Sequence, residues 1–337
     1  MVFVPKPQVD TETRKQANKA ASTRNTYPSS FSMKLLFIFI DGIGLGEDNP
    51  EINPFVRAEM PYLQSLLGGQ KMIKSAAPYE SDQVTLLPID AGLGVKGLPQ
   101  SATGQAVLLT GINIPAEIGY HYGPKPNSEV AQYLDGATIF SKTIKAGKKT
   151  ALLNAYPPRY FHGIDSGKRL YSSVPLALTN AGLTLFTDED YYAGNALSAD
   201  FTGAGWHSFL GFADAPLFEP ETAGVRLAEL AQQYDFSFFE YWASDYAGHK
   251  QDMSSAVQQL ETFDGVLKGL LANWHNKNNL ILLTSDHGNM EDLSTRKHTA
   301  AHVPLLLFGD LNNRREFQKD IRDLTGIAPA INSFLEI

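Results

Sequence analysis

Three short segments of this chain place carboxylates and imidazoles at spacings that suit a site for two metal ions. The candidate ligands are Asp41, Asp245, His249, Asp286 and His287, with His298 close behind the last. Carboxylate and imidazole together suit Zn²⁺ or Mn²⁺, whereas Mg²⁺ prefers oxygen and keeps its waters. The chain has no cysteine, which excludes thiolate ligands. The pattern predicts two divalent cations, with Zn or Mn favoured over Mg.

The spacing within each segment brings the side chains to one place. Asp286 and His287 are adjacent, and neighbours in extended backbone point opposite ways, so the pair can serve two cations. Asp245 and His249 are four positions apart, which on a helical turn places them on one side. Asp41 follows six apolar residues, where a carboxylate needs a partner and a cation is a suitable one.

Each segment also has an ordinary structural explanation. Asp286 suits a turn that ends a strand, Asp245 suits a helix N-cap, and Asp41 suits a turn in which it bonds to its neighbours. The coincidence of three such segments, each with Asp and two with His, favours the metal site.

The elements that position these residues are apolar runs read as buried strands. In open α/β sheets, ligands gather beyond the carboxyl ends of the strands. Strands and helices alternate, which predicts a largely parallel sheet covered on both faces, a three-layer α/β sandwich. The expected strands are 34–40, 83–89, 149–154, 236–242, 279–284 and 303–308, and the expected helices are 60–67, 101–111, 138–146, 222–233, 253–274 and 326–335.

Composition shifts divide the chain into three parts. Residues 1–32 are polar without apolar periodicity, and we interpret them as a flexible tail before one domain, 33–337. Residues 157–221 are rich in Gly, Pro and aromatic residues, which predicts a small insertion over the active-site edge. Its aromatic residues Tyr191, Tyr192 and Trp206 suit either the walls of a pocket or plain packing.

Charge and hydropathy argue against nucleic acids and membranes as binding partners. The formal net charge of -8 argues against nucleic acid. The longest apolar run, 35–40, is too short to cross a bilayer, and the first residues lack the apolar stretch of a signal peptide. We therefore expect no membrane association and a cytoplasmic location.

The motif set resembles the alkaline phosphatase superfamily, most closely the branch with cofactor-independent phosphoglycerate mutase and phosphopentomutase. Asp41-Gly42 looks like its opening motif, Asp245-x-x-Gly248-His249 its Asp-x-x-Gly-His pair, and Asp286-His287-Gly288-Asn289 its Asp-His-Gly-Asn. His298-Thr299 is similar to its final His-Thr. The resemblance covers about 33–155 and 222–337. It implies an alkaline phosphatase-like fold.

The resemblance also implies a hydroxyl nucleophile that opens a helix. The branch reads Ser or Thr, two residues, Gly and then His, which maps the nucleophile onto Ser101, with Thr103 the alternative. Gln105 stands where the branch has His. A hydroxyl at a helix N-terminus sits in positive potential, which suits this role, although Ser also favours such positions simply as a cap.

In the ligand grouping that the resemblance implies, Asp41, Asp286, His287 and Ser101 hold one cation. Asp245, His249 and His298 hold the other.

The implied activity is metal-dependent phosphoryl transfer on a small phosphoester through a phosphoserine. A hydrolase is favoured because the insertion is small for a mutase cap domain; a phosphoglycerate or phosphosugar mutase and a non-catalytic metal-binding scaffold are the alternatives. Three loop residues could bind a substrate phosphate or carboxylate, or be solvated charges: His121, Lys125 and Arg159.

Overall fold

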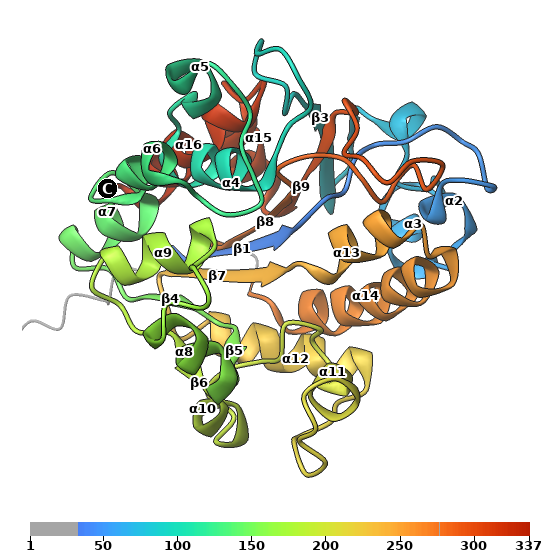
Figure 1. Ribbon diagram of the computed structural model, residues 1–337. Helices are drawn as coiled ribbons and strands as arrows, with labels where there is room; N and C mark the ends of the chain where they lie inside the picture. Colours follow the sequence, from blue (N-terminus) through green and yellow to red (C-terminus); the bar gives the residue numbers. More distant parts are fainter. Residues whose placement is uncertain (1–32, 276) are drawn as a thin grey trace, which may run out of the picture. The chain divides into compact units, whose positions relative to one another are not determined.

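A seven-stranded sheet forms the centre of the part of the chain that the computed structural model describes, residues 33–275 and 277–337 (Figure 1). The strand order is β2-β3-β9-β8-β1-β7-β4. The strands are β1 Leu35–Ile40, β2 Tyr79–Glu80, β3 Val84–Ile89, β4 Thr150–Leu152, β7 Phe236–Tyr241, β8 Leu280–Thr284 and β9 Val303–Gly309. The tail expected at 1–32 lies outside the described residues.

The sheet is largely parallel, as the sequence predicts. Strands β4, β7, β1 and β8 pair in parallel in that order. Strand β9 is antiparallel to both β8 and β3, so β3 runs in the same direction as the parallel group. The short edge strand β2 pairs antiparallel with β3. The carboxyl ends of β7, β1 and β8 therefore meet side by side at one edge.

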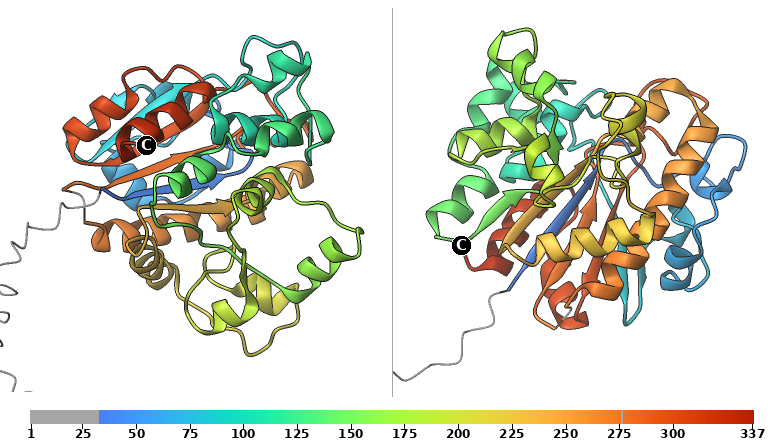
Figure 2. Two further views of the ribbon diagram at one scale, coloured as in Figure 1. Left: turned by 90° about the vertical axis from the view of Figure 1, so that its left-hand side faces the viewer. Right: turned by 90° about the horizontal axis from the view of Figure 1, so that it is seen from below.

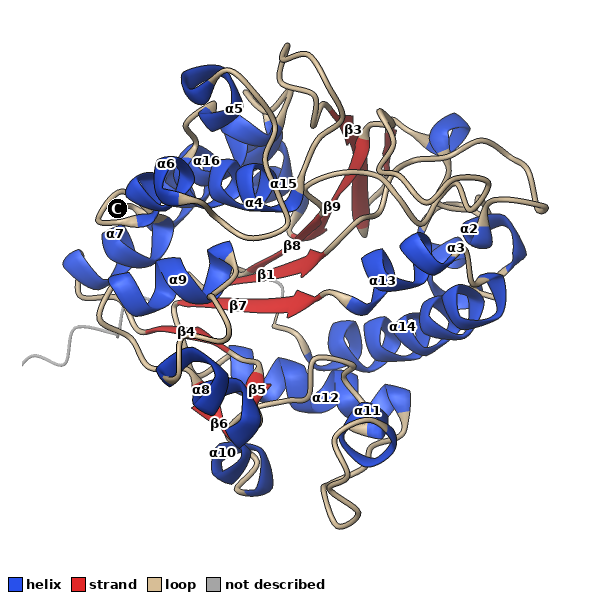
Figure 3. Cartoon of the chain, in the orientation of Figure 1, coloured by secondary structure: helices blue, strands red, loops and turns tan. Residues whose placement is uncertain are grey.

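Strand β1 shows why the sheet is covered on both faces. All six of its residues are buried, and alternate side chains enter different cores. Leu36 and Ile38 pack in a core with residues of α12 (Pro220–Ala231) and α14 (Met253–Asn273). Leu35 and Phe37 pack in a core with residues of α4 (Ser101–Thr110), α7 (Ile139–Lys145) and α9 (Ser173–Asn180). The result is a layer of helices on each face of the sheet (Figures 2 and 3).

The helices agree with most of the expected ones to within two residues. They are α2 Pro54–Arg57, α3 Pro61–Leu66, α4 Ser101–Thr110, α5 Ile114–Ile118, α6 Ser128–Ala131, α7 Ile139–Lys145, α8 Pro158–Asp165, α9 Ser173–Asn180, α10 Asp188–Tyr192, α11 Ala204–Ser208, α12 Pro220–Ala231, α13 Ala243–Lys250, α14 Met253–Asn273, α15 Leu311–Gln318 and α16 Ile327–Leu335. Short 3₁₀ turns are η1 Lys74–Ala76, η2 Gln132–Leu134 and η3 Leu324–Gly326. None of the helices in the described ranges has the length and apolar composition needed to cross a membrane.

The segment 157–221 is more regular than its sequence indicates. It contains α8 to α11, and its strand β6 Phe186–Thr187 pairs in parallel with β5 Ala155–Tyr156. Helix α9 buries Val174 and Leu178 in the core beside α4, so this part of the segment covers a face of the sheet. Tyr191 and Trp206 are buried in a small separate core with ring centroids 4.8 Å apart. For these two residues, packing and not a pocket wall is what the structure shows.

Candidate metal centre

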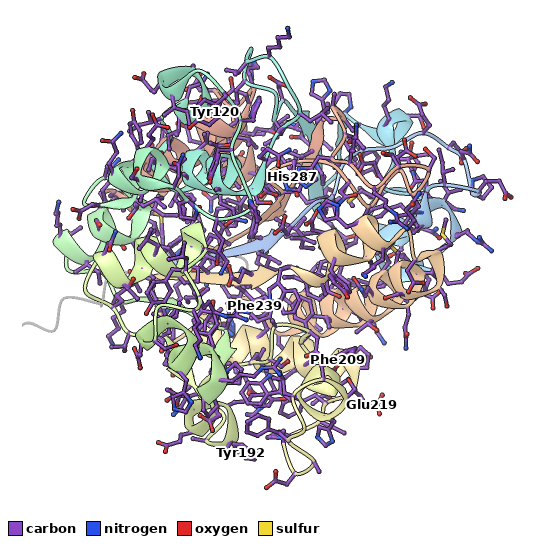
Figure 4. All side chains as sticks on the ribbon, viewed as in Figure 1. Tyr120, Tyr192, Phe209, Glu219, Phe239 and His287 are labelled. Atoms are coloured by element: carbon purple, nitrogen blue, oxygen red, sulfur yellow. The ribbon has the colours of Figure 1, made fainter. Side chains whose placement is uncertain are left out.

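The fold brings the three predicted ligand segments together at the carboxyl edge of the sheet. Asp41 directly follows β1, which lies between β7 and β8. Helix α13 starts two residues after β7 and carries Asp245 and His249, and Asp286 and His287 come just after β8. His287 lies toward the middle of the view in Figure 4. Ser101 is the first residue of α4.

One group of candidate ligands consists of Asp245, His249 and His298. Ligand atoms of these three residues lie within 4.8 Å of one another. Asp245 Oδ2 is 3.2 Å from His249 Nε2, and Asp245 Oδ1 is 3.7 Å from His298 Nε2. This is the set that the sequence assigns to one cation.

The second group shares Asp245 with the first. Ligand atoms of Asp41, Asp245 and His287 also lie within 4.8 Å of one another. His287 Nε2 is 3.4 Å from Asp41 Oδ1 and 3.7 Å from Asp286 Oδ2. Ser101 Oγ lies 3.0 Å from the same nitrogen. Six side chains and one hydroxyl from distant parts of the chain thus form one continuous cluster.

Backbone carbonyls orient all three imidazoles. His298 Nδ1 lies 2.7 Å from the Pro99 carbonyl, and His249 Nδ1 lies 2.7 Å from the Arg296 carbonyl. His287 Nδ1 lies 3.3 Å from the Gly288 carbonyl. A carbonyl can only accept, so these contacts assign the proton to Nδ1 in each neutral ring. Each Nε2 lone pair then faces the cluster, the arrangement that metal-binding histidines use.

This arrangement fits bound cations because the cluster without them is electrostatically unfavourable. The Nε2 atoms of His249 and His298 are only 3.3 Å apart, and with both protons on Nδ1 their lone pairs oppose each other. Asp41 Oδ1 is buried and has no hydrogen-bond partner among the described residues. Cations held between these atoms would satisfy both nitrogens and the orphaned oxygen.

Burial and close packing of the cluster also shift the pKa values of three of its groups. Burial, followed by the charges of Asp286 and Asp245, raises the pKa of Asp41 well above its ordinary value. Burial, and next the charge of Asp245, raises the pKa of Asp286 to about 7. Burial, and next the neighbouring His298, lowers the pKa of His287 to about 3. The surroundings therefore disfavour the charged forms of Asp41, Asp286 and His287, and bound cations would restore the charged form of the two carboxylates.

The first turn of α4 separates the two candidate nucleophiles. Ser101 Oγ faces His287, while Thr103 Oγ1 donates to the carbonyls of Gln100 and Tyr122, at 3.1 and 3.3 Å. The Thr103 hydroxyl thus bonds to the loop that contains Tyr122 and does not face His287. Gln105, four residues after Ser101 and on the same helix face, donates through Nε2 to Asp286 Oδ2 at 3.4 Å. The Gln that replaces the branch's His still contacts the cluster.

Glu291 is a site residue that the motif reading missed. Its buried carboxylate accepts from the Gly44 and Asn289 amides, at 2.9 and 2.8 Å, and from the Thr299 hydroxyl. It thereby ties together the turns that follow β1 and β8 and the loop that carries His298. A carboxylate shortly after the Asp286 motif was the available signal, but an acidic residue in a loop is usually solvated.

Asn289 makes a further link by donating to Asp245 Oδ1 at 2.6 Å. A side chain at Gly42 could not fit, because its Cβ would lie 2.6 Å from Asp245 Oδ1. The residue has a positive φ of 67° as well, so both space and backbone conformation require glycine there.

The three predicted substrate contacts lie in other segments. His121 is half-buried beside the backbone of Gly92 and Val95, and burial lowers its pKa. Lys125 Nζ donates to the Leu170 carbonyl at 2.5 Å, and Arg159 is exposed near the start of α8. His121 and Lys125 lie on either side of Tyr122 and Gly123, in a loop that contacts the first turn of α4. The Tyr122 amide donates to Thr103 Oγ1, and a Cβ on Gly123 would lie 3.2 Å from the Ser101 amide nitrogen.

Comparisons with known proteins agree with the motifs. Residues 221–337 match the family model described as the Metalloenzyme superfamily. A 2,3-bisphosphoglycerate-independent phosphoglycerate mutase of Antithamnion sp. is 30% identical over 115 residues, 32% of this chain and 22% of that protein. One of Yersinia pestis (strain Pestoides F) is 28% identical over 132 residues, 35% of this chain and 25% of that protein. The matches thus span about a quarter of these relatives.

Solved structures share the fold over most of the chain. A protein of Pyrococcus horikoshii is similar with a TM-score of 0.52 and 15% identity, covering 90% of this chain and 97% of that one. An alkaline phosphatase from the Antarctic bacterium TAB5 is similar with a TM-score of 0.50 and 14% identity, covering 90% and 98%. At these identities the likeness concerns the fold alone. The chain therefore has a fold like that of this alkaline phosphatase, and its residues 221–337 are similar to the metalloenzyme family model.

Proposed function

We propose that this chain is a member of the alkaline phosphatase superfamily and a metal-dependent phosphoester hydrolase that works through a phosphoserine at Ser101. The observation that carries the proposal is the Ser101 hydroxyl, 3.0 Å from His287 Nε2 at the edge of a cluster of carboxylates and imidazoles. A hydroxyl held in that place can reach a phosphoryl group bound at the same cluster.

The residues that would hold the cations are those of the cluster. Asp41, Asp286, His287 and Ser101 form one proposed set, and Asp245, His249 and His298 form the other. Asp245 also lies within reach of the first set. Bound divalent cations would lower the pKa of the Ser101 hydroxyl and neutralise the phosphoryl oxygens.

The chain's own groups supply the positioning. Ser101 Oγ forms a bond to phosphorus while the ester P–O bond breaks and the alcohol leaves. Water then cleaves the phosphoserine and releases phosphate. The first turn of α4 adds the positive end of its helix dipole where negative charge gathers. Lys125 lies two residues after Gly123, whose Cβ position is close to the Ser101 amide nitrogen, and we infer that its charge attracts an anionic substrate.

A mutase is the second candidate, because the two curated relatives described above carry that name. In a mutase a second hydroxyl of the substrate, and not water, accepts the phosphoryl group. Incubation of metal-loaded protein with phosphoglycerate, a pentose phosphate and a panel of simple monoesters, followed by ³¹P NMR, separates the two. Inorganic phosphate as the product supports the hydrolase, an isomerised phosphoester supports the mutase, and neither product from any substrate contradicts both.

A further inference from the structure

Two large aromatic side chains are exposed beside the candidate metal centre. Trp242, the residue that precedes α13, is 56% exposed, and Tyr246 within α13 is 62% exposed. The other tryptophans, Trp206 and Trp274, are only 3% and 5% exposed. Proteins generally bury or pair aromatic surface of this size, so an exposed pair on one short helix calls for an explanation.

Both aromatic residues share a helix face with metal-ligand candidates. At about 100° per residue, positions 242, 245, 246 and 249 fall within an arc of about 100°. The opposite face of α13 is buried through Ser244, Ala247 and Gly248. Residues three or four apart on a helix have Cβ atoms about 5–6 Å apart, so the two rings lie beside Asp245 and His249 on this face.

The same face is where the cluster opens to solvent. The His249 and Asp245 side chains are 43% and 17% exposed, whereas those of Asp286 and His287 are fully buried. His249 is the most exposed of the ligand candidates in these ion pairs, so a molecule whose phosphoryl group lies against the buried ligands can extend outward past it. Its remaining part would then lie along the exposed face of α13.

We propose that Trp242 and Tyr246 form a binding surface for an aromatic ring in the alcohol part of the phosphoester substrate. The proposal rests on the proposed function and narrows it to aryl phosphoesters, or phosphoesters that carry a flat ring such as a base. Indole and phenol rings bind such groups by offset stacking, which adds to the area buried. Lys250, whose Nζ lies 5.5 Å from the Tyr246 ring centroid, leaves the Trp242 ring as the larger open surface.

Trp242 offers a readout that does not depend on turnover. It is the exposed one of the three tryptophans, so a neutral quencher such as acrylamide should act mainly on its fluorescence. In metal-loaded protein, saturating phenylphosphonate should reduce the quenching constant by at least half, and saturating methylphosphonate should leave it near the ligand-free value. Equal quenching with both phosphonates, each shown to be bound by competition with phosphate, would overturn the proposal.

Variants test the same surface through specificity. Trp242→Ala and Tyr246→Ala should each lower the ratio of kcat/KM for phenyl phosphate to kcat/KM for methyl phosphate, by about tenfold for Trp242, mainly through KM. Tyr246→Phe, which keeps the ring, should retain the ratio. Tyr192→Ala is the matched control, since Tyr192 is 41% exposed and lies at the periphery of the molecule, far from His287 (Figure 4).

Three other outcomes would overturn the inference in distinguishable ways. If Trp242 becomes protected as protein concentration rises without ligand, the surface joins two copies of the chain. If metal-loaded protein binds neither phosphonate and hydrolyses neither ester, the proposed function fails and the inference falls with it. If both esters are hydrolysed but the ratio is the same in all variants, only the inference fails.

Discussion

The imidazole rings of His287 and His298 stack with centroids 3.6 Å apart and planes inclined by 14°. The stack joins the two groups of candidate ligands, one ring from each. Two parallel imidazoles this close cannot both carry a positive charge, in keeping with the lowered pKa of His287. The stacking therefore favours neutral imidazole rings, whose Nε2 lone pairs can bind cations in the cluster.

Metal content is the first prediction. Protein prepared without chelator should contain about two divalent cations per chain, and chelator should lower the melting temperature. The removed cations would leave Asp41, Asp245 and Asp286 close together, and crowded carboxylates repel. Elemental analysis and thermal unfolding before and after chelation measure this. A metal-free preparation that neither binds nor is stabilised by added Zn²⁺, Mn²⁺ or Mg²⁺ would contradict it.

Ser101→Ala should abolish turnover and leave most metal binding, because the carboxylate and imidazole ligands remain. Thr103→Ala should retain turnover but lower the free energy of unfolding by about 1–2 kcal/mol, because the Tyr122 amide loses its 3.1 Å acceptor. Turnover assays and denaturant unfolding compare the two variants.

A covalent test accompanies that comparison. Mass spectrometry of protein quenched during turnover should find phosphate on Ser101. Phosphate on Thr103, together with full activity of Ser101→Ala, would transfer the nucleophile role to Thr103.

The buried carboxyl of Glu240 should make the stability of the fold depend on pH. Its carboxyl is buried and hydrogen-bonded to the Tyr156 hydroxyl at 2.6 Å, and burial raises its pKa from 4.5 to about 7. Between these values the folded protein holds a proton that the unfolded chain has lost, so stability is lost as pH rises through about 7. The loss is at most about 3 kcal/mol.

Glu240→Gln should remove that loss. Urea unfolding of metal-free protein at pH 5 and pH 7.5 should show the variant gaining stability relative to the original chain at the higher pH. Metal-free samples keep metal binding from contributing. A difference between the two proteins that is the same at both pH values would count against a raised pKa for Glu240.

Glu291→Gln should weaken metal binding by about 10- to 100-fold, as loss of supporting hydrogen bonds around metal ligands commonly does. The backbone amides of Gly44 and Asn289 both donate to the Glu291 carboxylate. The side-chain NH₂ of a glutamine there would also be a donor, so it cannot accept from them. Competition with a chromogenic chelator measures the affinity. Glu316→Gln, at an exposed position, is the control, and equal affinity in both variants would assign Glu291 no part in holding the ligands.

The sequence predicts a helix or strand well where its pattern of apolar residues is sufficient to decide the structure. The apolar runs before Asp41 and Asp286 were sufficient for β1 and β8. Apolar residues at spacings of three or four along 253–274, such as Leu260, Phe263 and Leu267, were sufficient for α14. The antiparallel direction of β9 was not predictable, because pairing depends on where distant strands meet. Its Pro304 lies opposite Pro88 in β3, and neither residue identifies its partner from sequence.

The short helices α8 to α11 were missed for a related reason. Glycine and aromatic residues obscure the periodicity there, although α9 buries Val174 and Leu178 on one side. For the site, residue types and motif spacing identified the side chains that the fold brings together. Support from Glu291 and the carbonyls at Pro99 and Arg296 arises only from tertiary contacts.

The position of β1 between β7 and β8 has a consequence for biosynthesis. This strand, Leu-Leu-Phe-Ile-Phe-Ile, leaves the ribosome before both of its partners, which are made roughly 200 to 250 residues later. At about 5–20 residues per second that delay is tens of seconds. Until then both edges of an apolar strand are unpaired, which is a hazard for aggregation. An unpaired apolar strand of this kind is a segment that chaperones can shield until its partners are made.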